Sequence, residues 1–291
     1  MLETMGLRTI EGPYPHHCFT AANGDQLRVV PERGGLVTGW ISGGQERLYF
    51  DAERFADASK SIRGGIPVLF PICGNLPGNQ LDLPQGSYTL PQHGFARDLP
   101  WQLQPLSDGS GIRLVLESNP QTLAAFPFAF RLSLDYRLEP SALEILTTVE
   151  HTSGSEGSMP FSLGLHPYFA VSSLRAASLD GLPEVCLDHH QMAPSSTADQ
   201  LGRLSEGVDL LTDPRGDSVR LLDAGSGQTV TLELSAPLDL AVVWSEPPRS
   251  MVCLEPWTAP RGSLVTGDRR LQLDPGQAIQ LRCRYVCSEA G

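Results

Sequence analysis

Three short segments each set a titratable side chain among apolar, Gly or Pro neighbours, surroundings that suit an ordered site better than a solvated face. His93 lies in the segment QHGFAR, His166 in GLHPYF and Glu255 in VCLEPW. If the fold brings them together, the chain has an acid, a base and an orienting imidazole. That set is sufficient for moving protons on a neutral substrate.

A plainer interpretation remains open for the two histidines, because each could simply hydrogen-bond a backbone carbonyl in a turn. Glu255 is harder to explain in this way. It ends the apolar run 251–254, and a carboxylate there needs a partner or a function. The other histidines lie in polar stretches, where we expect them to be exposed or to cap elements: His16, His17, His151, His189 and His190.

Alternating apolar and polar residues predict strands along most of the chain. Residues 128–138 alternate in this way, residues 139–142 form a turn, and residues 143–149 alternate again, so the pair predicts an antiparallel hairpin. Four further segments repeat the pattern: 112–117, 229–234, 240–244 and 278–285.

Turn residues and scarce helical signals point to one fold class. Gly (29 residues) and Pro (24 residues) recur between short apolar runs, as expected for many strands joined by turns. Residues 51–60 could form one short helix, whereas 153–158 and 195–206 look like loops within one unit. Without a repeat or a linker, the sequence predicts an all-β chain: a single domain over residues 1–291, built as one large antiparallel β-sandwich.

Composition limits the function classes. The net charge of −12 argues against nonspecific nucleic-acid binding, which needs a basic surface. We see no apolar run long enough for a signal peptide or a membrane span, so we expect a cytoplasmic protein without membrane contact. The dispersed cysteines lack the paired spacing of a zinc site, and we expect reduced thiols at Cys18, Cys73, Cys186, Cys253, Cys283 and Cys287.

Four motifs together carry a family resemblance. They are RGGIPVLFP at 63–71, HGFAR at 93–97, HPYF at 166–169 and LEPW at 254–257. In this order, the chain resembles the aldose 1-epimerase (mutarotase) family from about residue 23 to the last strand. The resemblance implies the galactose-mutarotase-like supersandwich, and the first two motifs are most similar to the branch that includes glucose-6-phosphate 1-epimerases.

The resemblance implies an isomerase that interconverts the α and β anomers of a hexose or hexose 6-phosphate. One group takes the proton of the C1 hydroxyl while another protonates the ring oxygen, and the roles reverse when the ring closes. By resemblance Glu255 is the base, His166 is the acid, and His93 holds the sugar near its ring oxygen. We expect neither a cofactor nor a metal, and the partner is a small sugar or sugar phosphate.

The resemblance also implies residues that bind the substrate. Arg63 and Arg97 would grip a 6-phosphate, which guanidinium groups bind well; the alternative is two solvated or ion-paired arginines. Asp209 is the candidate for the substrate-binding Asp of many relatives. Three aromatic side chains would offer a face to the C–H groups of the sugar, although at least one could be plain core: Phe70, Tyr168 and Trp257.

Departures from the family pattern leave the substrate open. The Asn-rich sequence around the first His of free-sugar mutarotases is missing, and Pro167 stands where many phosphate-sugar relatives have Thr or another residue. Two other function classes remain, a non-catalytic sugar-binding or regulatory protein and a glycan-processing enzyme. The latter favours a second domain or paired carboxylates, and neither is evident in the sequence. The oligomeric state is also open.

Overall fold

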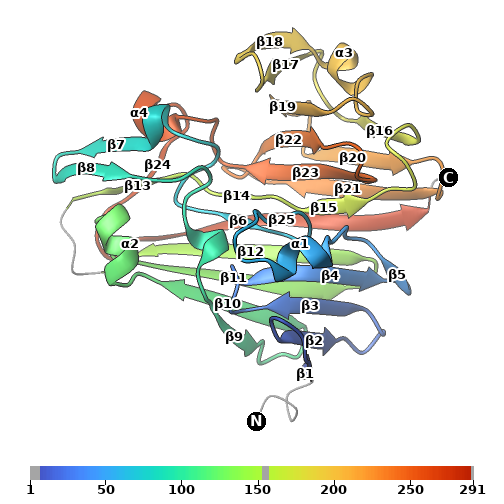
Figure 1. Cartoon of the computed structure of the whole chain (residues 1–291), viewed down its shortest axis with the longest axis horizontal. Coiled ribbons are helices and arrows are strands. Elements are labelled where there is room, and N and C mark those ends of the chain that lie inside the picture. The colour runs from blue at the N-terminus through green and yellow to red at the C-terminus, as the bar shows by residue number, and fades with distance from the viewer. Residues whose placement is uncertain (1–6, 153–156, 290–291) are drawn as a thin grey trace.

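The computed structural model describes residues 7–152 and 157–289. Two eight-stranded antiparallel sheets form its centre (Figure 1). The first sheet has the order β16 (Ala177–Asp180), β20 (Ser218–Asp223), β21 (Gln228–Leu234), β25 (Ala278–Glu289), β12 (Ala142–His151), β11 (Phe130–Glu139), β10 (Gly111–Glu117), β9 (Gln102–Pro105). The second has the order β18 (Ala193–Ser196), β17 (Val185–Asp188), β19 (Val208–Thr212), β22 (Leu240–Ser245), β23 (Met251–Trp257), β14 (Gly164–Leu165), β6 (Val68–Leu69), with β15 (Tyr168–Ala170) also paired to β23.

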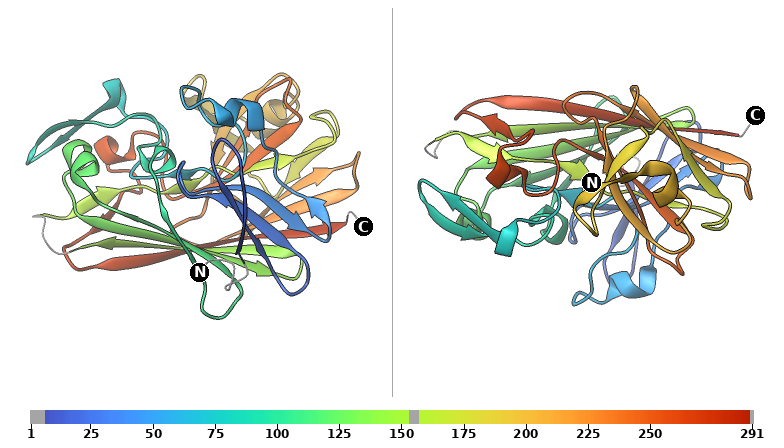
Figure 2. Two further views of the ribbon diagram at one scale, coloured as in Figure 1. Left: turned by 60° about the horizontal axis from the view of Figure 1, so that its bottom comes forward. Right: turned by 90° about the horizontal axis from the view of Figure 1, so that it is seen from above.

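A third sheet and two small two-stranded sheets complete the strands (Figure 2). The third sheet runs β1 (Leu7–Ile10), β2 (His16–Thr20), β3 (Gln26–Val30), β4 (Leu36–Ser42), β5 (Gln45–Glu46), and the small pairs are β7 (Gln80–Leu83) with β8 (Gly86–Thr89) and β13 (Met159–Phe161) with β24 (Leu271–Leu273). The helices are short: α1 (Ala52–Ala56), α2 (Pro120–Ala125), α3 (Thr197–Leu201), α4 (Ser263–Thr266) and the 3₁₀ turns η2 (Pro77–Asn79) and η3 (Ala96–Asp98).

The predicted hairpin is present as β11 and β12, which pair from Phe130 opposite His151 to Glu139 opposite Ala142. One face of this pair is buried, as the alternation of apolar residues required. The buried face packs against the second sheet, and the Tyr285 hydroxyl of β25 donates to Leu254 O of β23 at 3.0 Å. The predicted antiparallel β-sandwich is therefore confirmed, while the single domain over residues 1–291 stays a prediction.

The second sheet buries both of its faces, and this positions the site. Side chains alternate along β23, so Val252 and Leu254 belong to the main core between the sheets. The side chains of Glu255 and Trp257 therefore lie on the opposite face of the sheet. There a separate small apolar cluster forms: Leu69, Cys73, Leu211, Leu240, Val242 and Trp257. Polar side chains on this second face are thus held by a rigid, well-packed sheet.

One expectation from the sequence was wrong and another was partly right. Residues 195–206 are not simply a loop, since they hold the end of β18 and all of α3, where the Ser196 hydroxyl accepts from Asp199 N and caps the helix. The predicted helix in 51–60 is shorter, Ala52–Ala56, with Asp51 as its N-cap. The expected loop at 153–158 lies mostly outside the described residues.

The histidines expected to be exposed divide into three groups. His190 is exposed, and His16 and His17 are half-buried. His151 and His189 are buried, which contradicts the expectation. Both sit at strand ends where the chain folds over them, and a polar local sequence does not reveal such tertiary cover. Among the described residues no helix is long and apolar enough to cross a membrane; the cytoplasmic location stays a prediction.

Candidate active site

A cavity of about 280 Å³ opens on the second face of the second sheet. Its volume is near the lower end of ligand sites, roughly 300–1,000 Å³, which suits a monosaccharide. Strands β19, β22 and β23 form its floor, and the loops around residues 61–63, 92–97 and 261 form its walls. It is lined by Ser61, Arg63, Gln92, His93, Arg97, His166, Tyr168, Asp209, Val242, Trp244, Glu255, Trp257 and Arg261.

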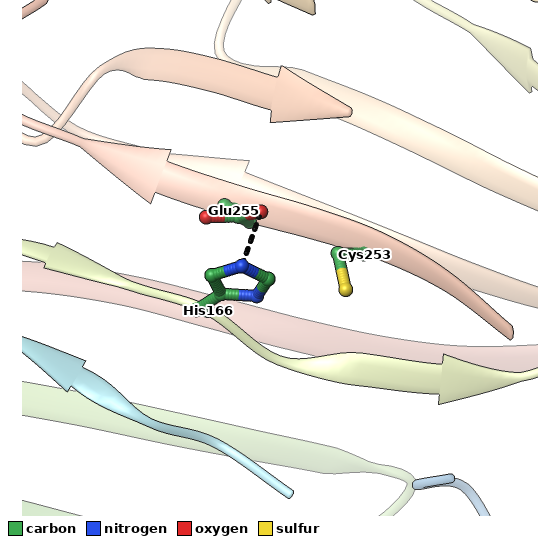
Figure 3. Close-up of side chains that lie close together, drawn as sticks. All are labelled: His166, Cys253 and Glu255. Carbon is green, nitrogen blue, oxygen red and sulfur yellow. Dashed lines mark ion pairs between the residues drawn. The ribbon is translucent and has the colours of Figure 1, made fainter. Parts of the chain in front are cut away.

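His166 and Glu255 meet in this cavity (Figure 3). Nε2 of His166 lies 3.3 Å from Oε1 of Glu255, and the two side chains are 13% and 1% exposed. His166 follows β14, where its backbone N–H donates to Pro67 O at 2.9 Å, and Glu255 sits opposite Val242 in the ladder of β22 and β23. Both groups therefore project from paired strands rather than from free loops.

Burial changes the protonation of this pair. Burial raises the pKa of the Glu255 carboxyl well above its usual range, and the negative charge of Asp209 adds to the effect. Burial lowers the pKa of His166 to about 3, and the positive charge of Arg97 adds to that effect. Both shifts favour a proton on the Glu255 carboxyl next to a neutral His166 imidazole. Transfer of that proton to His166 produces a base and an acid at once.

Trp257 fixes the other oxygen of the carboxyl. Its indole Nε1 donates to Oε2 of Glu255 at 3.0 Å, two residues along the same face of β23. Gly164 leaves room for the indole, because a Cβ at this position would lie 2.7 Å from Trp257 Cδ1 and 3.0 Å from Cys73 Sγ. A single N–H thus sets the orientation of the carboxyl.

His93 is presented by a backbone turn with a φ of 67°. Gly74 N donates to Nδ1 of His93 at 3.1 Å, which places the imidazole proton on Nε2. Burial lowers the pKa of His93 well below its usual range, and the positive charge of Arg97 adds a smaller effect in the same direction. His93 is therefore a neutral N–H donor on the cavity wall, as holding a sugar oxygen requires.

The two arginines of the predicted phosphate site differ. Arg63 is ion-paired: Nε and Nη2 donate to Glu246 at 2.7 and 3.1 Å, and Nη1 donates to Ser61 Oγ and Ile62 O. Within the part of the chain that the structure describes, Arg97 makes one hydrogen bond, from Nη2 to Gln92 O at 2.9 Å. An Asp98 oxygen lies 3.9 Å from its Nε. Most N–H groups of Arg97 therefore remain open to a ligand, whereas most of those of Arg63 do not.

Asp209 lines the cavity, and both of its oxygens are engaged. Oδ1 lies 2.7 Å from Nδ1 of His189, and Oδ2 accepts from Nη2 of Arg261 at 2.8 Å. Burial opposes ionisation of this carboxyl, but the hydrogen bond from His189 and the nearby positive charges outweigh it, so the pKa of Asp209 is lowered. Asp209 is an ionised, firmly held acceptor.

Aromatic rings form two walls of the cavity. Tyr168 stacks on His166 with centroids 4.8 Å apart, and Trp244 meets His166 edge-on at 5.6 Å. Trp257 also lines the cavity, but Phe70 does not. Phe70 is fully buried in the main core, because its side chain points to the other face of the sheet from Leu69. Phe70 is therefore plain core, the alternative that the sequence left open for at least one of the three aromatic residues.

Three side chains at the acid–base pair are of types that bind metal ions. His166, Cys253 and Glu255 offer ligand atoms within 4.8 Å of one another (Figure 3). Burial raises the pKa of the Cys253 thiol well above its usual range, so the thiolate that binds metals is disfavoured. The arginines that line the cavity repel a cation as well. The donor set therefore fits acid–base chemistry better than a metal.

Reasoning from sequence missed several residues of the site. Arg261 and His189 hold Asp209, and Gln92 and Ser61 contact the side chains or backbone of the site wall. No local pattern marks Arg261 or His189, which reach the site only through the fold. Gln92 stands directly before His93 and could have been included from its position.

The protein is an antiparallel β-sandwich with a buried carboxyl–imidazole pair in a cavity on one sheet, and a comparison with protein families identifies its class. The family model described as Aldose 1-epimerase matches residues 17–286. The chain belongs to the aldose 1-epimerase family, as its motifs predicted.

Individual relatives agree with this assignment. The solved structure of the Slr1438 protein from Synechocystis sp. PCC 6803 is 37% identical, with a TM-score of 0.86 over 91% of this chain and 92% of that one. A galactose mutarotase related enzyme from Lactobacillus acidophilus is 20% identical, with a TM-score of 0.75 over 98% of both chains, and shows the fold alone.

Two curated relatives bear the name "Putative glucose-6-phosphate 1-epimerase". The relative from Cenchrus ciliaris is 30% identical over 51% of this chain, and the one from Escherichia coli K12 is 28% identical over 65%. The matched stretches cover 45% and 58% of those proteins, so this chain spans about half of their length.

Proposed function

We propose that the protein is an aldose 1-epimerase that acts on a hexose 6-phosphate. The observation that carries the proposal is the buried pair of Glu255 and His166, 3.3 Å apart, in one cavity with the open guanidinium of Arg97. The pair supplies the acid and the base. The guanidinium supplies a partner for a phosphate, and the names of the two curated relatives agree with this substrate.

The reaction opens and recloses the sugar ring. With the shared proton on His166, the Glu255 carboxylate takes the proton of the C1 hydroxyl, and the C1–O5 bond breaks as His166 protonates O5. The open aldehyde rotates about C1–C2. His166 then removes the O5 proton, O5 attacks the other face of C1, and Glu255 returns a proton to O1. Each proton returns to the group that gave it, and the enzyme ends in its starting state.

Other residues hold the sugar during the reaction. The Nε2–H of His93 is suited to an oxygen near the ring oxygen, and Asp209 is suited to accept from a ring hydroxyl through its remaining lone pairs. Tyr168 and Trp257 face the cavity from its aromatic walls. These contacts keep C1 and O5 next to the acid–base pair while the aldehyde turns.

The phosphate has an electrostatic consequence for the acid. The positive charge of Arg97 contributes to the low pKa of His166, and that of Arg63 contributes less. A phosphate bound at Arg97 offsets this charge and so favours the proton on His166 rather than on Glu255. A phosphorylated hexose is therefore expected both to bind better and to activate the pair.

A glycan-processing enzyme needs two free carboxyl groups at the scissile bond. The cavity does contain two carboxyl groups, Asp209 and Glu255. Asp209, however, is ionised and held by His189 and Arg261, and this arrangement suits binding better than nucleophilic attack. The arrangement therefore favours epimerisation.

Exchange spectroscopy by NMR tests the proposal, because it measures the interconversion of anomers at equilibrium. Glucose 6-phosphate and glucose are compared with and without the protein, and the spontaneous rate is subtracted. We expect catalysis of both, with the lower KM for the phosphorylated sugar. If neither sugar is accelerated although both bind, the protein is a non-catalytic sugar-binding protein of the same fold.

A further inference from the structure

The His189 side chain is fully buried beside the cavity, where the sequence predicted an exposed residue. Its Nδ1 lies 2.7 Å from Asp209 Oδ1, and its backbone N–H donates to Asp209 O at 2.9 Å. Because the carboxylate accepts, Nδ1 carries the proton. Arg261 holds the other oxygen of Asp209. His189 is thus one of two side chains that fix the direction of this carboxylate.

The same imidazole also supports Trp257. The two rings are stacked, with centroids 5.8 Å apart and an interplanar angle of 28°. The other side of the indole is confined near Gly164, where even a Cβ would be too close. Trp257 in turn donates to Glu255. The His189 ring therefore contacts two residues of the site. It hydrogen-bonds Asp209 directly, and it stacks on Trp257, which donates to Glu255.

We propose that His189 is a positioning residue that orients Asp209 through its Nδ1–H and orients Glu255 through the stacked indole of Trp257. This inference rests on the proposed function, since Glu255 matters as a base only if the protein is an epimerase. His189 itself touches no reacting atom. Its two roles use different parts of the ring, the N–H edge and the π face, so they can be separated by substitution.

Two substitutions separate the roles. His189→Asn retains an N–H donor near the position of Nδ1 but has no ring to support Trp257. His189→Phe retains a ring that can stack on the indole but has no donor for Asp209. If the ring has two separate roles, the two variants must fail in different ways. A residue that only fills space would instead lose stability and activity in parallel in both variants.

The expected failures differ in kind. In His189→Asn the indole loosens and its hydrogen bond to Glu255 weakens, which raises the pKa of that carboxyl further. The pair reacts with one proton, which it loses from Glu255 on the alkaline side, so the alkaline limb of kcat/KM then moves upward by about one pH unit. In His189→Phe the alkaline limb stays in place, but Asp209 is released on one side. We expect KM for the sugar to rise about tenfold, the scale of one lost hydrogen bond.

The pH shift must be assigned to Glu255 against its titratable and charged neighbours. These are His166, Asp209 and Arg261 in the cavity, Cys73, Cys253 and Tyr168 beside it, and Tyr285 on the facing sheet. Trp257→Phe serves as the matched variant, because it removes the indole N–H that donates to Glu255 and leaves a smaller aromatic ring. It should show the same alkaline-limb shift as His189→Asn.

The experiment measures kcat and KM for glucose 6-phosphate from pH 5 to 9 in the wild type and these variants, with thermal unfolding as a control for folding. It also follows the ¹⁵N-labelled indole signal of Trp257 in the ligand-free proteins. That signal is assigned by its loss in Trp257→Phe, and its pH titration reports Glu255 without any turnover. The indole midpoint should move upward in His189→Asn and stay unchanged in His189→Phe.

The outcomes are distinguishable. If the wild type shows no anomer exchange, the proposed function fails, while the indole titration still tests whether His189 orients the carboxyl. If both variants keep the wild-type limbs, KM and indole midpoint, or lose stability and activity in parallel, the positioning role is wrong. Should His189→Phe fail to fold, His189→Leu removes the same donor to Asp209 and should raise KM alike; an unchanged KM would overturn that half of the proposal.

Discussion

Arg97→Gln is expected to weaken binding of glucose 6-phosphate far more than binding of glucose. The substitution keeps a polar side chain but removes the positive charge and most of the donors. Arg97 suits a phosphate because its one hydrogen bond within the described part of the chain, to Gln92 O, leaves the rest of the guanidinium open. Burial, followed by the nearby charge of Arg63, lowers the pKa of Arg97. A bound anion offsets both the burial of the Arg97 charge and its repulsion by Arg63.

The size of the effect follows from the donors that remain open. A guanidinium edge can give a phosphate two charge-assisted hydrogen bonds, each worth about 1.5–3 kcal/mol. These energies do not add fully, so we expect a loss of about 2–4 kcal/mol, or roughly 30- to 900-fold in Kd. Arg63 already gives most of its N–H groups to Glu246, Ser61 and Ile62. Arg63→Gln should therefore cost only about 1–2 kcal/mol, or roughly 5- to 30-fold.

Isothermal titration of both sugars, with KM measured alongside, provides the assay. Arg113→Gln is a matched control, because Arg113 is ion-paired to Asp135 on the first sheet and lies outside the cavity lining. It should leave both sugars unaffected. An equal loss for glucose and glucose 6-phosphate in Arg97→Gln would refute the reasoning and make Arg97 structural. So would a larger phosphate-specific loss in Arg63→Gln than in Arg97→Gln.

Three further predictions follow from the geometry of the site. His166→Asn should lower kcat for either sugar about 10²-fold or more, as measured by NMR exchange; a near wild-type rate would exclude His166 as the acid. The acidic limb of kcat should lie at higher pH for glucose 6-phosphate than for glucose: the pair reacts with one proton, a second proton goes to His166, and a phosphate offsets the charge of Arg97 that lowers the pKa of His166. Coincident limbs in polarimetric pH profiles would contradict this. Gly164→Ala should displace Trp257, costing about 1–3 kcal/mol in urea unfolding and most of kcat, whereas Gly216→Ala, in open space, should cost neither.

Strand alternation made the fold predictable from sequence. The strands of the β11–β12 hairpin, Phe130–Glu139 and Ala142–His151, overlap the predicted 128–138 and 143–149, because each strand buries one face against the second sheet. The sequence did not show which of the three aromatic residues near the motifs belong to the core. An aromatic residue next to a motif looks functional, but the place of Phe70 one residue after Leu69 puts its side chain in the main core.

The acid–base pair was also within reach of sequence reasoning, since His166 and Glu255 each stand out as polar groups among apolar neighbours. The supporting residues were not. His189 lies in a polar stretch, and only the pairing of β17 with β19 brings it to Asp209. Arg261 comes from a loop whose sequence has no distinguishing pattern. Contacts between distant segments depend on the packing of the whole chain, and local patterns do not report them.

The asymmetry of the two arginines was likewise beyond the sequence. Arg63 and Arg97 lie in motifs of equal strength, so the sequence predicted equal partners in a phosphate site. The difference arises from Glu246, which lies in the turn after β22 and far from both in sequence. It neutralises Arg63, whereas the Asp98 carboxylate lies 3.9 Å from Nε of Arg97.

The most direct measurement compares anomer exchange of glucose 6-phosphate in the wild type and in Glu255→Gln. The amide retains the size of the carboxyl and can still accept from Trp257, so the fold and the binding of sugar should persist. It cannot take the proton of the C1 hydroxyl. We predict catalysed exchange in the wild type and a rate close to the spontaneous one in Glu255→Gln, with similar Kd for the sugar. A variant that binds sugar and exchanges anomers at the wild-type rate would contradict the assignment of Glu255 as the base.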